Sequence, residues 1–467
     1  MKLTAFTSAG MCEKSIFIHG ENIPYTFEFE TATFTGGAEI TAFTYIMKDA
    51  SPERPVLFIT NGGPGSSVCW LHLGLFGPRR IHLDDPIHPQ TVPPYALEDN
   101  PHCLLDICDL VLMDPPGAGF SAGPDAETAK EFFSVDGDAQ AFSLFIETWT
   151  ERHGRANSPL YFAGESYGTL RGPALADALF GGPFTKHQRL LSISLSGILF
   201  LGTAFTTAAT MLQKPPVEES VLNLPCCAAT AAYHYPDRFP SPADAAQAAW
   251  DFAPEYLTAL FMGNALPEEK LAEIAEKLQR FTNIPAPALL SSGLRFSMEQ
   301  FKNAVLPGKQ VGGYDGRYTM VGTGKPGNFP MPGMKEPIAE DAAMGMYTPA
   351  FIGGMNLLRQ EFALPAGTYN AINFAVNGQW DYNSNRPALH SLENAMRRNP
   401  SMRLFFGTGL YDLVTVPGNV RYTLQNSDLP TERVTALEYE SGHMPYLGEN
   451  SAEKLEADIR TFIRENL

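Results

Sequence analysis

The sequence predicts an α/β fold with a central, mostly parallel and twisted sheet that helices flank. Two observations support this fold class. Short apolar segments of strand length alternate with segments whose apolar residues recur at helical spacing, which is typical of parallel strands joined by helical crossovers. Residues 164–168 read Gly-Glu-Ser-Tyr-Gly and stand between such a strand and such a helix, where this motif forms a sharp turn that exposes its serine.

The elements are expected in the following order along the chain. Residues 15–48 alternate in polarity and are rich in Phe, Thr and Ile, which predicts antiparallel edge strands. The strands of the main sheet are expected at the apolar segments 54–60, 109–114, 159–163, 190–201, 402–409 and 434–439. Helices are expected at 135–153, 169–179, 417–427 and 451–466.

The pattern changes between the two halves of the predicted sheet. Segments such as 241–280 are rich in Ala, Glu and Leu and predict helices, whereas 306–337 is dense in Gly and Pro and predicts loops. We therefore predict a sheet domain in two parts, residues 1–201 and 346–467, with a mostly helical cap inserted at 202–345.

Composition limits the location and the partners of the protein. The chain of 467 residues has a formal net charge of −18, which argues against nucleic-acid binding because that needs a basic face. The N-terminus lacks a sustained apolar run and a cleavage site, so no signal peptide is expected. The sequence contains no stretch of about 18 apolar residues, so no membrane-spanning helix is expected. A cytoplasmic protein is expected, and a homodimer is compatible with the sequence.

The sequence predicts neither a metal site nor a cofactor. The six cysteines include no C-x-x-C pair, which argues against a zinc or thiol redox site and favours small buried apolar residues. Residues 322–325 read Gly-Thr-Gly-Lys, but Pro326 stands where a phosphate-binding loop has Ser or Thr, and the leading glycine is absent. An ordinary loop is expected there.

A nucleophilic serine needs a base, and the base needs a third group that fixes its tautomer. When the nucleophile lies on a turn of this kind, the three follow in the chain order serine, acid, histidine. Ser166 is followed by Asp412 at the end of one predicted strand and by His443 just past the last one. Asp381, in a loop-like stretch, is a weaker candidate for the acid.

The same chemistry needs two donors for a tetrahedral oxyanion. The amide of Tyr167, directly after the serine, is the expected first donor. The second should come from the glycine-rich loop after an early strand, where the amide of Gly63 is the best candidate.

Five motifs together resemble the serine carboxypeptidase family. They are residues 61–67, 114–121, 164–168, 409–412 and 441–444. The resemblance extends from about residue 55 to the end of the chain, and the segment around Leu224 and Pro225 is similar to the cap of bacterial-type members. The resemblance implies an α/β-hydrolase fold with an inserted cap, and an enzyme that removes residues from the C-terminus of a peptide.

In that family an Asn in the first loop and the Glu before the nucleophile bind the terminal carboxylate of the substrate, which implies these roles for Asn61 and Glu165. A substrate carboxylate beside Glu165 can be held only if the two share a proton, so peptides should bind more tightly at acid pH. Two positions depart from the family: Ser66 stands where a Cys is frequent, and Leu75 replaces an acid that often precedes Leu-Gly-Pro.

Three functions remain compatible with these residues. The first is a serine-type carboxypeptidase that works through an acyl-enzyme on Ser166 and takes a peptide with a free C-terminus. The second is an esterase or acyltransferase that uses the same residues on a non-peptide ester, which the loss of the acid at Leu75 favours. The third is a non-catalytic binding protein.

Overall fold

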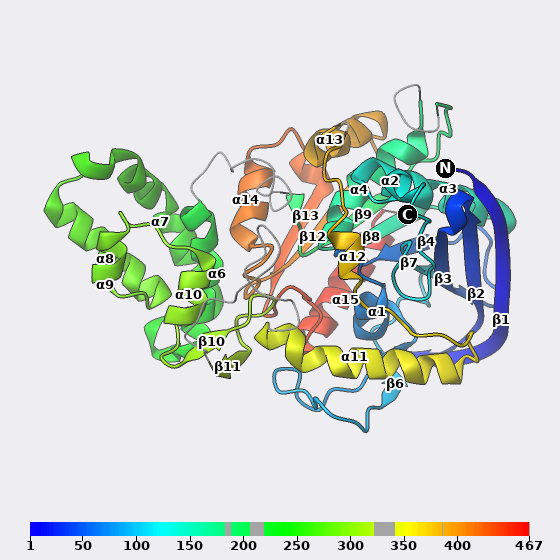
Figure 1. Ribbon diagram of the computed structural model, residues 1–467, viewed down its shortest axis with the longest axis horizontal. Helices are drawn as coiled ribbons and strands as arrows, with labels where there is room; N and C mark the ends of the chain where they lie inside the picture. Colours follow the sequence, from blue (N-terminus) through cyan, green and yellow to red (C-terminus); the bar gives the residue numbers. More distant parts are fainter. Residues whose placement is uncertain (183–187, 206–218, 322–340, 385, 467) are drawn as a thin grey trace.

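A nine-stranded sheet runs through the protein (Figure 1). The computed structural model describes residues 1–182, 188–205, 219–321, 341–384 and 386–466. The strand order is β1-β2-β3-β7-β4-β8-β9-β12-β13. The bounds are β1 Leu3–Ile18, β2 Glu21–Phe34, β3 Glu39–Met47, β7 Asp109–Asp114, β4 Val56–Thr60, β8 Leu160–Glu165, β9 Gly197–Leu201, β12 Arg403–Gly409 and β13 Val434–Tyr439.

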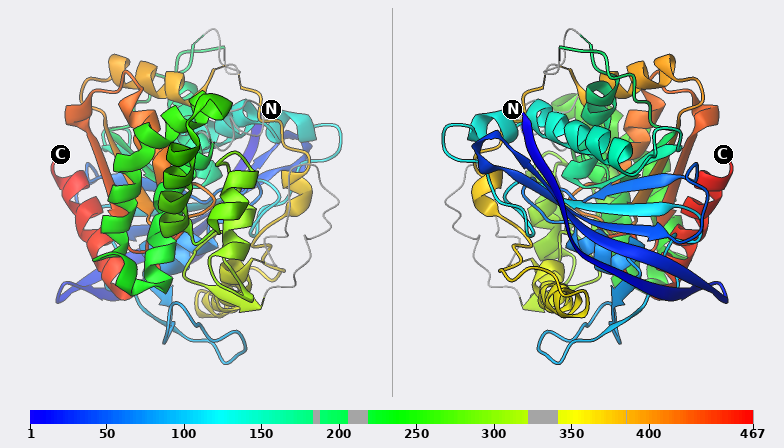
Figure 2. Two further views of the ribbon diagram at one scale, coloured as in Figure 1. Left: turned by 90° about the vertical axis from the view of Figure 1, so that its left-hand side faces the viewer. Right: turned by 90° about the vertical axis from the view of Figure 1, so that its right-hand side faces the viewer.

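The first strands are antiparallel and the others are parallel. β1, β2 and β3 form a meander, and β3 joins β7 in antiparallel register, with Phe43 opposite Leu112. From β7 to β13 every neighbouring pair is parallel. The long β1 and β2 curve along one edge of the sheet (Figure 2, right). The predicted α/β class and the N-terminal edge strands are confirmed, although β1 begins at Leu3 and not at residue 15.

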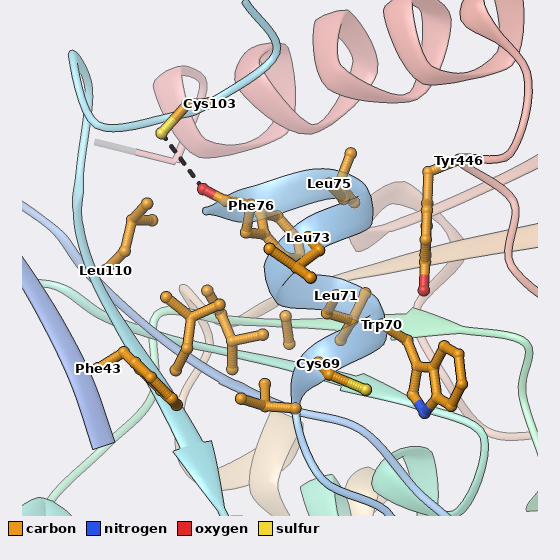
Figure 3. Close-up of a cluster of buried hydrophobic side chains, with 14 of the residues drawn as sticks. Phe43, Cys69, Trp70, Leu71, Leu73, Leu75, Phe76, Cys103, Leu110 and Tyr446 are labelled. Atoms are coloured by element: carbon orange, nitrogen blue, oxygen red, sulfur yellow. Dashed lines mark hydrogen bonds between the residues drawn. The ribbon is translucent and has the colours of Figure 1, made fainter. Parts of the chain in front are cut away.

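Each central strand is buried on both faces, because successive side chains point to opposite sides. Phe58 and Phe162 point into one apolar core, with the helices α3 (Val135–Arg152), α4 (Tyr167–Phe180) and α13 (Ala388–Arg398). Leu57 and Tyr161 point into the other core. That core includes α11 (Ala342–Glu361), α15 (Glu449–Arg464) and the short helical turns α1 (Cys69–Leu71) and η2 (His72–Phe76), which Figure 3 shows.

The predicted helices α3, α4, α14 (Pro417–Gln425) and α15 are present within a few residues of their expected bounds. The strand predicted at 190–201 is too long, because β9 begins only at Gly197. Leu190 is 64% exposed and Ser192 has a φ of 57°, a conformation that no strand contains. α11 and α13 were not predicted.

A group of helices lies to one side of the sheet (Figure 1, green) and contains an apolar core of its own. These helices are α6 (Glu219–His234), α7 (Pro242–Met262), α8 (Glu268–Thr282), α9 (Ala286–Ser291) and α10 (Met298–Ala304). The hairpin of β10 (Lys309–Val311) and β11 (Thr319–Val321) follows them. Residues 322–325, the weak phosphate-loop match, lie outside the described residues. α11 runs through residue 345, where we predicted the end of the cap.

No described helix is both long enough and apolar enough to cross a membrane. All six cysteines are free, and all except the half-buried Cys12 are buried. This confirms the expectation that they pack as small apolar residues.

A buried ion pair joins α3 and α4 to the loop after β4. The Arg171 guanidinium is fully buried; it donates to Asp138 at 2.7 Å and to the carbonyl of Asn61 at 2.8 Å. Burial alone would raise the pKa of Asp138, and it outweighs the opposing effect of Arg171. Each charge therefore depends on its partner.

We expect Asp138→Ala to lower the free energy of unfolding by about 3–5 kcal/mol, because it leaves the Arg171 charge buried without a counter-ion. Urea unfolding followed by circular dichroism measures the change. Asp428→Ala is the matched control: it removes the exposed partner of Arg397 and should cost less than about 1 kcal/mol. Similar losses in the two variants would contradict the importance of the buried pair.

Candidate active site

The turn between β8 and α4 holds Ser166 in a conformation that non-glycine residues seldom adopt, with φ 56° and ψ −121°. Its two glycines permit close backbone contacts. A Cβ atom on Gly164 would lie 2.2 Å from the carbonyl oxygen of Gly168, and one on Gly168 would lie 3.1 Å from the carbonyl oxygens of Thr60 and Asn61. The strand, turn and helix therefore form as the motif predicts, with Ser166 at the carboxyl end of β8.

The structure brings Asp412 and His443 together. Asp412 follows β12, and its Oδ2 lies 2.9 Å from Nδ1 of His443. Its Oδ1 accepts hydrogen bonds of 2.8 Å from the amides of Val414 and Thr415, and the Thr415 hydroxyl donates to Oδ2. The Asp412 side chain is thus fixed in place by four donors, one of which is the imidazole.

The charges of this pair support each other. Burial alone would raise the pKa of Asp412, but the nearby His443 and the hydrogen bonds from His443 and Thr415 bring it below its ordinary value. Burial alone would lower the pKa of His443, but the Asp412 carboxylate, with a smaller effect of Glu165, raises it above its ordinary value. Asp412 can therefore stay ionised and stabilise the imidazolium.

Ser166 and His443 line the same cavity. Within the described residues, no hydrogen bond links the Ser166 hydroxyl to the imidazole; such contacts often tighten only when substrate binds. Most of the other lining side chains are aromatic or aliphatic: Trp70, Tyr314, Met344, Tyr347, Ile372, Phe374 and Met444. No Lys or Arg is among the described residues that line this cavity.

The turn between β10 and β11 fixes the loop that carries His443. The backbone amide of His443 donates to the carbonyl of Tyr314 at 2.6 Å, and the Tyr314 ring packs edge-on against the imidazole, 5.1 Å between centroids. Arg317 donates to the carbonyl of Glu440 at 2.9 Å and to the Ser441 hydroxyl at 3.2 Å. No sequence pattern predicts this arrangement, because it depends on the path of two long loops.

The two predicted oxyanion donors belong to the turn at Ser166 and to the loop after β4, which are in contact. Tyr167 is the first residue of α4, so its amide has no acceptor inside the helix. The loop after β4 lies against that amide, since a Cβ atom on Gly62 would be 2.4 Å from the Tyr167 nitrogen. Gly63, with φ +99°, lines the cavity beside Ser166. The arrangement suits an anion between the two amides.

Glu165 and Asn61 are in direct contact. The Asn61 amide donates to Oε1 of Glu165 at 2.7 Å, and Oδ1 of Asn61 accepts from the amide of Leu71 at 3.1 Å. The hydroxyl of Tyr446 donates to Oε2 of Glu165 at 2.7 Å. Burial raises the pKa of Glu165 to about 7, although His443 and the two hydrogen bonds oppose the change. A group with this pKa changes its charge near neutral pH.

Tyr446 is a site residue that the sequence did not reveal. It lies three positions after His443, where an aromatic residue is also expected for ordinary core packing. Only the direction of its hydroxyl distinguishes it, and that direction depends on the fold.

Three other residues that the sequence analysis singled out lie in surroundings unlike one another. Asp381 is exposed, bonds to Asn383, and does not contact His443. Leu75 is buried in the apolar core, 1% exposed. Ser66 lines the cavity and accepts from the Trp70 indole at 3.0 Å.

One group of side chains in the described part of the chain could hold a metal ion: Glu28, Glu30 and His153. Glu30 already accepts hydrogen bonds from Thr44 and Trp149, and none of the three lines the cavity. They are therefore separate from the chemistry of Ser166.

Comparison with known proteins supports the fold and the enzyme class. The model of the serine carboxypeptidase family matches residues 40–215, which include Asn61, Gly63 and the turn at Ser166. A search of curated protein sequences finds no match. The resemblance to serine carboxypeptidases is thus confirmed by the family model, and the chain is a serine hydrolase.

Among solved structures, the carboxypeptidase Kex1Δp of Saccharomyces cerevisiae, described as prohormone-processing, aligns with a TM-score of 0.51 and 15% identity, over 92% of this chain and 88% of that one. A proline iminopeptidase of Mycobacterium smegmatis has a TM-score of 0.36 and 12% identity, over 97% and 98% of the two chains. An epoxide hydrolase of Aspergillus niger has a TM-score of 0.36 and 14% identity, over 95% and 79%. The first of these establishes the α/β-hydrolase fold.

We expect Asp412→Asn to slow the covalent labelling of Ser166 by an organophosphonate by about 10³- to 10⁴-fold, because His443 would lose the carboxylate that fixes its tautomer. Mass spectrometry of the intact protein over time measures the rate. Asp381→Asn is the matched control and should label at the wild-type rate. Equal rates for Asp412→Asn and the wild type would exclude Asp412 as the orienting acid.

Proposed function

We propose that the protein is a serine-type carboxypeptidase. Ser166 Oγ attacks the carbonyl carbon of the last peptide bond, while Nε2 of His443 takes the hydroxyl proton and Asp412 holds the imidazole at Nδ1. The amides of Gly63 and Tyr167 stabilise the oxyanion. His443 returns the proton to the leaving amine, so the C-terminal amino acid departs and an acyl-enzyme remains. Water, deprotonated by His443, then hydrolyses this ester.

The observation that favours a carboxypeptidase is the position of Glu165. This buried acid directly precedes Ser166 and is paired with the amide of Asn61 in the same cavity. A hydrolase that acts on a neutral ester has no need for an ionisable group there. A substrate carboxylate, in contrast, can bind to a protonated carboxyl group and an amide, both of which donate hydrogen bonds.

No Lys or Arg is among the described residues that line the cavity, so none of these residues offers the substrate carboxylate a permanent cation in place of that proton. The pKa of Glu165, raised by burial to about 7, keeps the carboxyl group protonated in acid and lets it ionise in alkali. Two carboxylates without a shared proton would repel each other. Carboxylate binding should therefore weaken as the pH rises through 7.

We expect the preference for a peptide over its C-terminal amide to depend on pH. Below pH 7 the peptide should be the better substrate; above pH 7 the ratio of the two kcat/KM values should fall by about tenfold per pH unit, as protonated Glu165 becomes scarce. Both substrates should lose activity in acid as His443 becomes protonated. Steady-state kinetics between pH 5 and 9 measures the ratio. A ratio of one at every pH would exclude the carboxypeptidase.

We expect Glu165→Gln to remove the pH dependence of this ratio, because the amide side chain does not titrate. The acid limb, which His443 governs, should also move to lower pH, since the negative charge of Glu165 contributes to the raised pKa of His443. Glu30→Gln is the matched control: Glu30 is equally buried but lies outside the cavity, so the pH profile should stay that of the wild type. An unchanged profile in Glu165→Gln would mean that Glu165 does not bind the carboxylate.

An esterase or acyltransferase that uses the same residues is the second candidate. Leu75, buried in the apolar core where related enzymes often have an acid, favours it, as do the apolar side chains that line the cavity. Equal rates for peptide and amide, with faster turnover of a neutral ester, would support this function over the first.

A further inference from the structure

We infer that Tyr446 is a positioning residue for carboxylate recognition: it fixes the orientation of Glu165 and sets the pH range in which Glu165 holds a substrate carboxylate. This inference rests on the function proposed above. It assigns to a phenol, three residues after His443, a role in substrate binding beside Asn61 and Glu165.

The phenol is held in place by its surroundings. Tyr446 is 2% exposed, and its hydroxyl donates to Oε2 of Glu165 at 2.7 Å, opposite the bond that Oε1 accepts from Asn61. Its ring fills the space beside η2, where a Cβ atom on Gly74 would lie 2.4 Å from Cε2 of the ring. Figure 3 shows Tyr446 beside the turn that carries Trp70 and Leu75. Glycine at position 74 is therefore required for the ring to reach this position.

Among the described residues that line the cavity, Glu165 has no second acid beside it. Leu75 follows Gly74 and points into the apolar core, so its side chain offers no hydrogen bond to Glu165 or to a substrate. The Glu165 carboxyl group is thus held by one amide and one phenol, from Asn61 and Tyr446. Because these bonds fix both oxygens, the plane of the carboxyl group is defined before the substrate arrives.

A phenol that donates to a carboxylate stabilises the ionised form, and so opposes the effect of burial. The other ionisable groups that face Glu165 are His443, which also favours its ionised form, and Asp412, which opposes it. The Tyr314 phenol and the Cys69 thiol lie nearby as well, and burial raises the pKa of each. Tyr314 and Cys69 therefore stay neutral near pH 7 and add no charge. Tyr446 differs from them because its hydroxyl donates a hydrogen bond to Glu165 and so lowers the pKa of that acid.

The test is Tyr446→Phe, which keeps the ring against Gly74 and removes only the hydroxyl. Without this donor the pKa of Glu165 should rise, so the alkaline loss of kcat/KM for the peptide should begin about one pH unit higher than in the wild type. The maximal kcat should change by less than about twofold, because the hydroxyl does not touch the reacting atoms. Loss of a merely structural role would lower activity at every pH without changing the pH at which the alkaline loss of kcat/KM begins.

Tyr439→Phe is the matched control. Its buried phenol donates to the carboxylate of Asp458 at 2.9 Å, outside the cavity, so this variant loses the same kind of bond without effect on the pH limit. An unchanged limit in Tyr446→Phe, or the same shift in Tyr439→Phe, would overturn the inference while a pH-dependent preference for the peptide in the wild type still supports the carboxypeptidase.

A second measurement does not depend on a peptide substrate. The rate at which a neutral organophosphonate labels Ser166 depends on the protonation of His443, and the charge of Glu165 contributes to the pKa of His443. If Tyr446→Phe makes Glu165 neutral over a wider range, the acid limb of labelling should move to lower pH. A labelling profile identical to that of the wild type would contradict the role of Tyr446, whatever the substrate of the enzyme proves to be.

Discussion

The turn at Ser166 requires backbone segments to approach more closely than any side chain permits. A Cβ atom on Gly62 would lie 2.8 Å from Cβ of Ser166, and one on Gly409 would lie 1.9 Å from the carbonyl oxygen of Gly442. The first contact joins the loop after β4 to the turn, and the second joins the end of β12 to the loop of His443. Glycine at these two positions therefore permits the close backbone contacts that bring the two loops to the turn.

Two acids, Asp412 and Glu165, lie near His443, and their different surroundings give them different pKa values. Asp412 accepts hydrogen bonds from the imidazole, a hydroxyl and two amides, and its pKa is lowered in spite of burial. Glu165 accepts hydrogen bonds from two neutral side chains. Burial outweighs their effect and raises the pKa of Glu165 to about 7. Asp412 thus stays charged near neutral pH and can orient His443, while Glu165 can gain or lose a proton in that range.

The strands of the parallel sheet could be predicted from the sequence, because strands buried on both faces appear as continuous apolar segments. The sequence was insufficient for the start of the strand predicted at 190–201, since the alternating pattern around Ser192 also fits a half-exposed loop. Motif order placed Ser166, Asp412 and His443 in one part of the fold. Tyr446 was not identified from the sequence, because its role depends on the direction in which a loop orients its hydroxyl. Neither spacing nor composition encodes that direction.

The helical group beside the sheet also contacts the loops that carry Asp412 and His443. Leu413 and Val416, one and four residues after Asp412, are part of the apolar core of α6–α10. The turn after β10 supplies the carbonyl of Tyr314 to the amide of His443 and the carbonyl of Gly313 to the amide of Leu413. Both the acid and the base are therefore anchored in part by this region. A rigid-body displacement of the helices would therefore disturb the positions of Asp412 and His443 together.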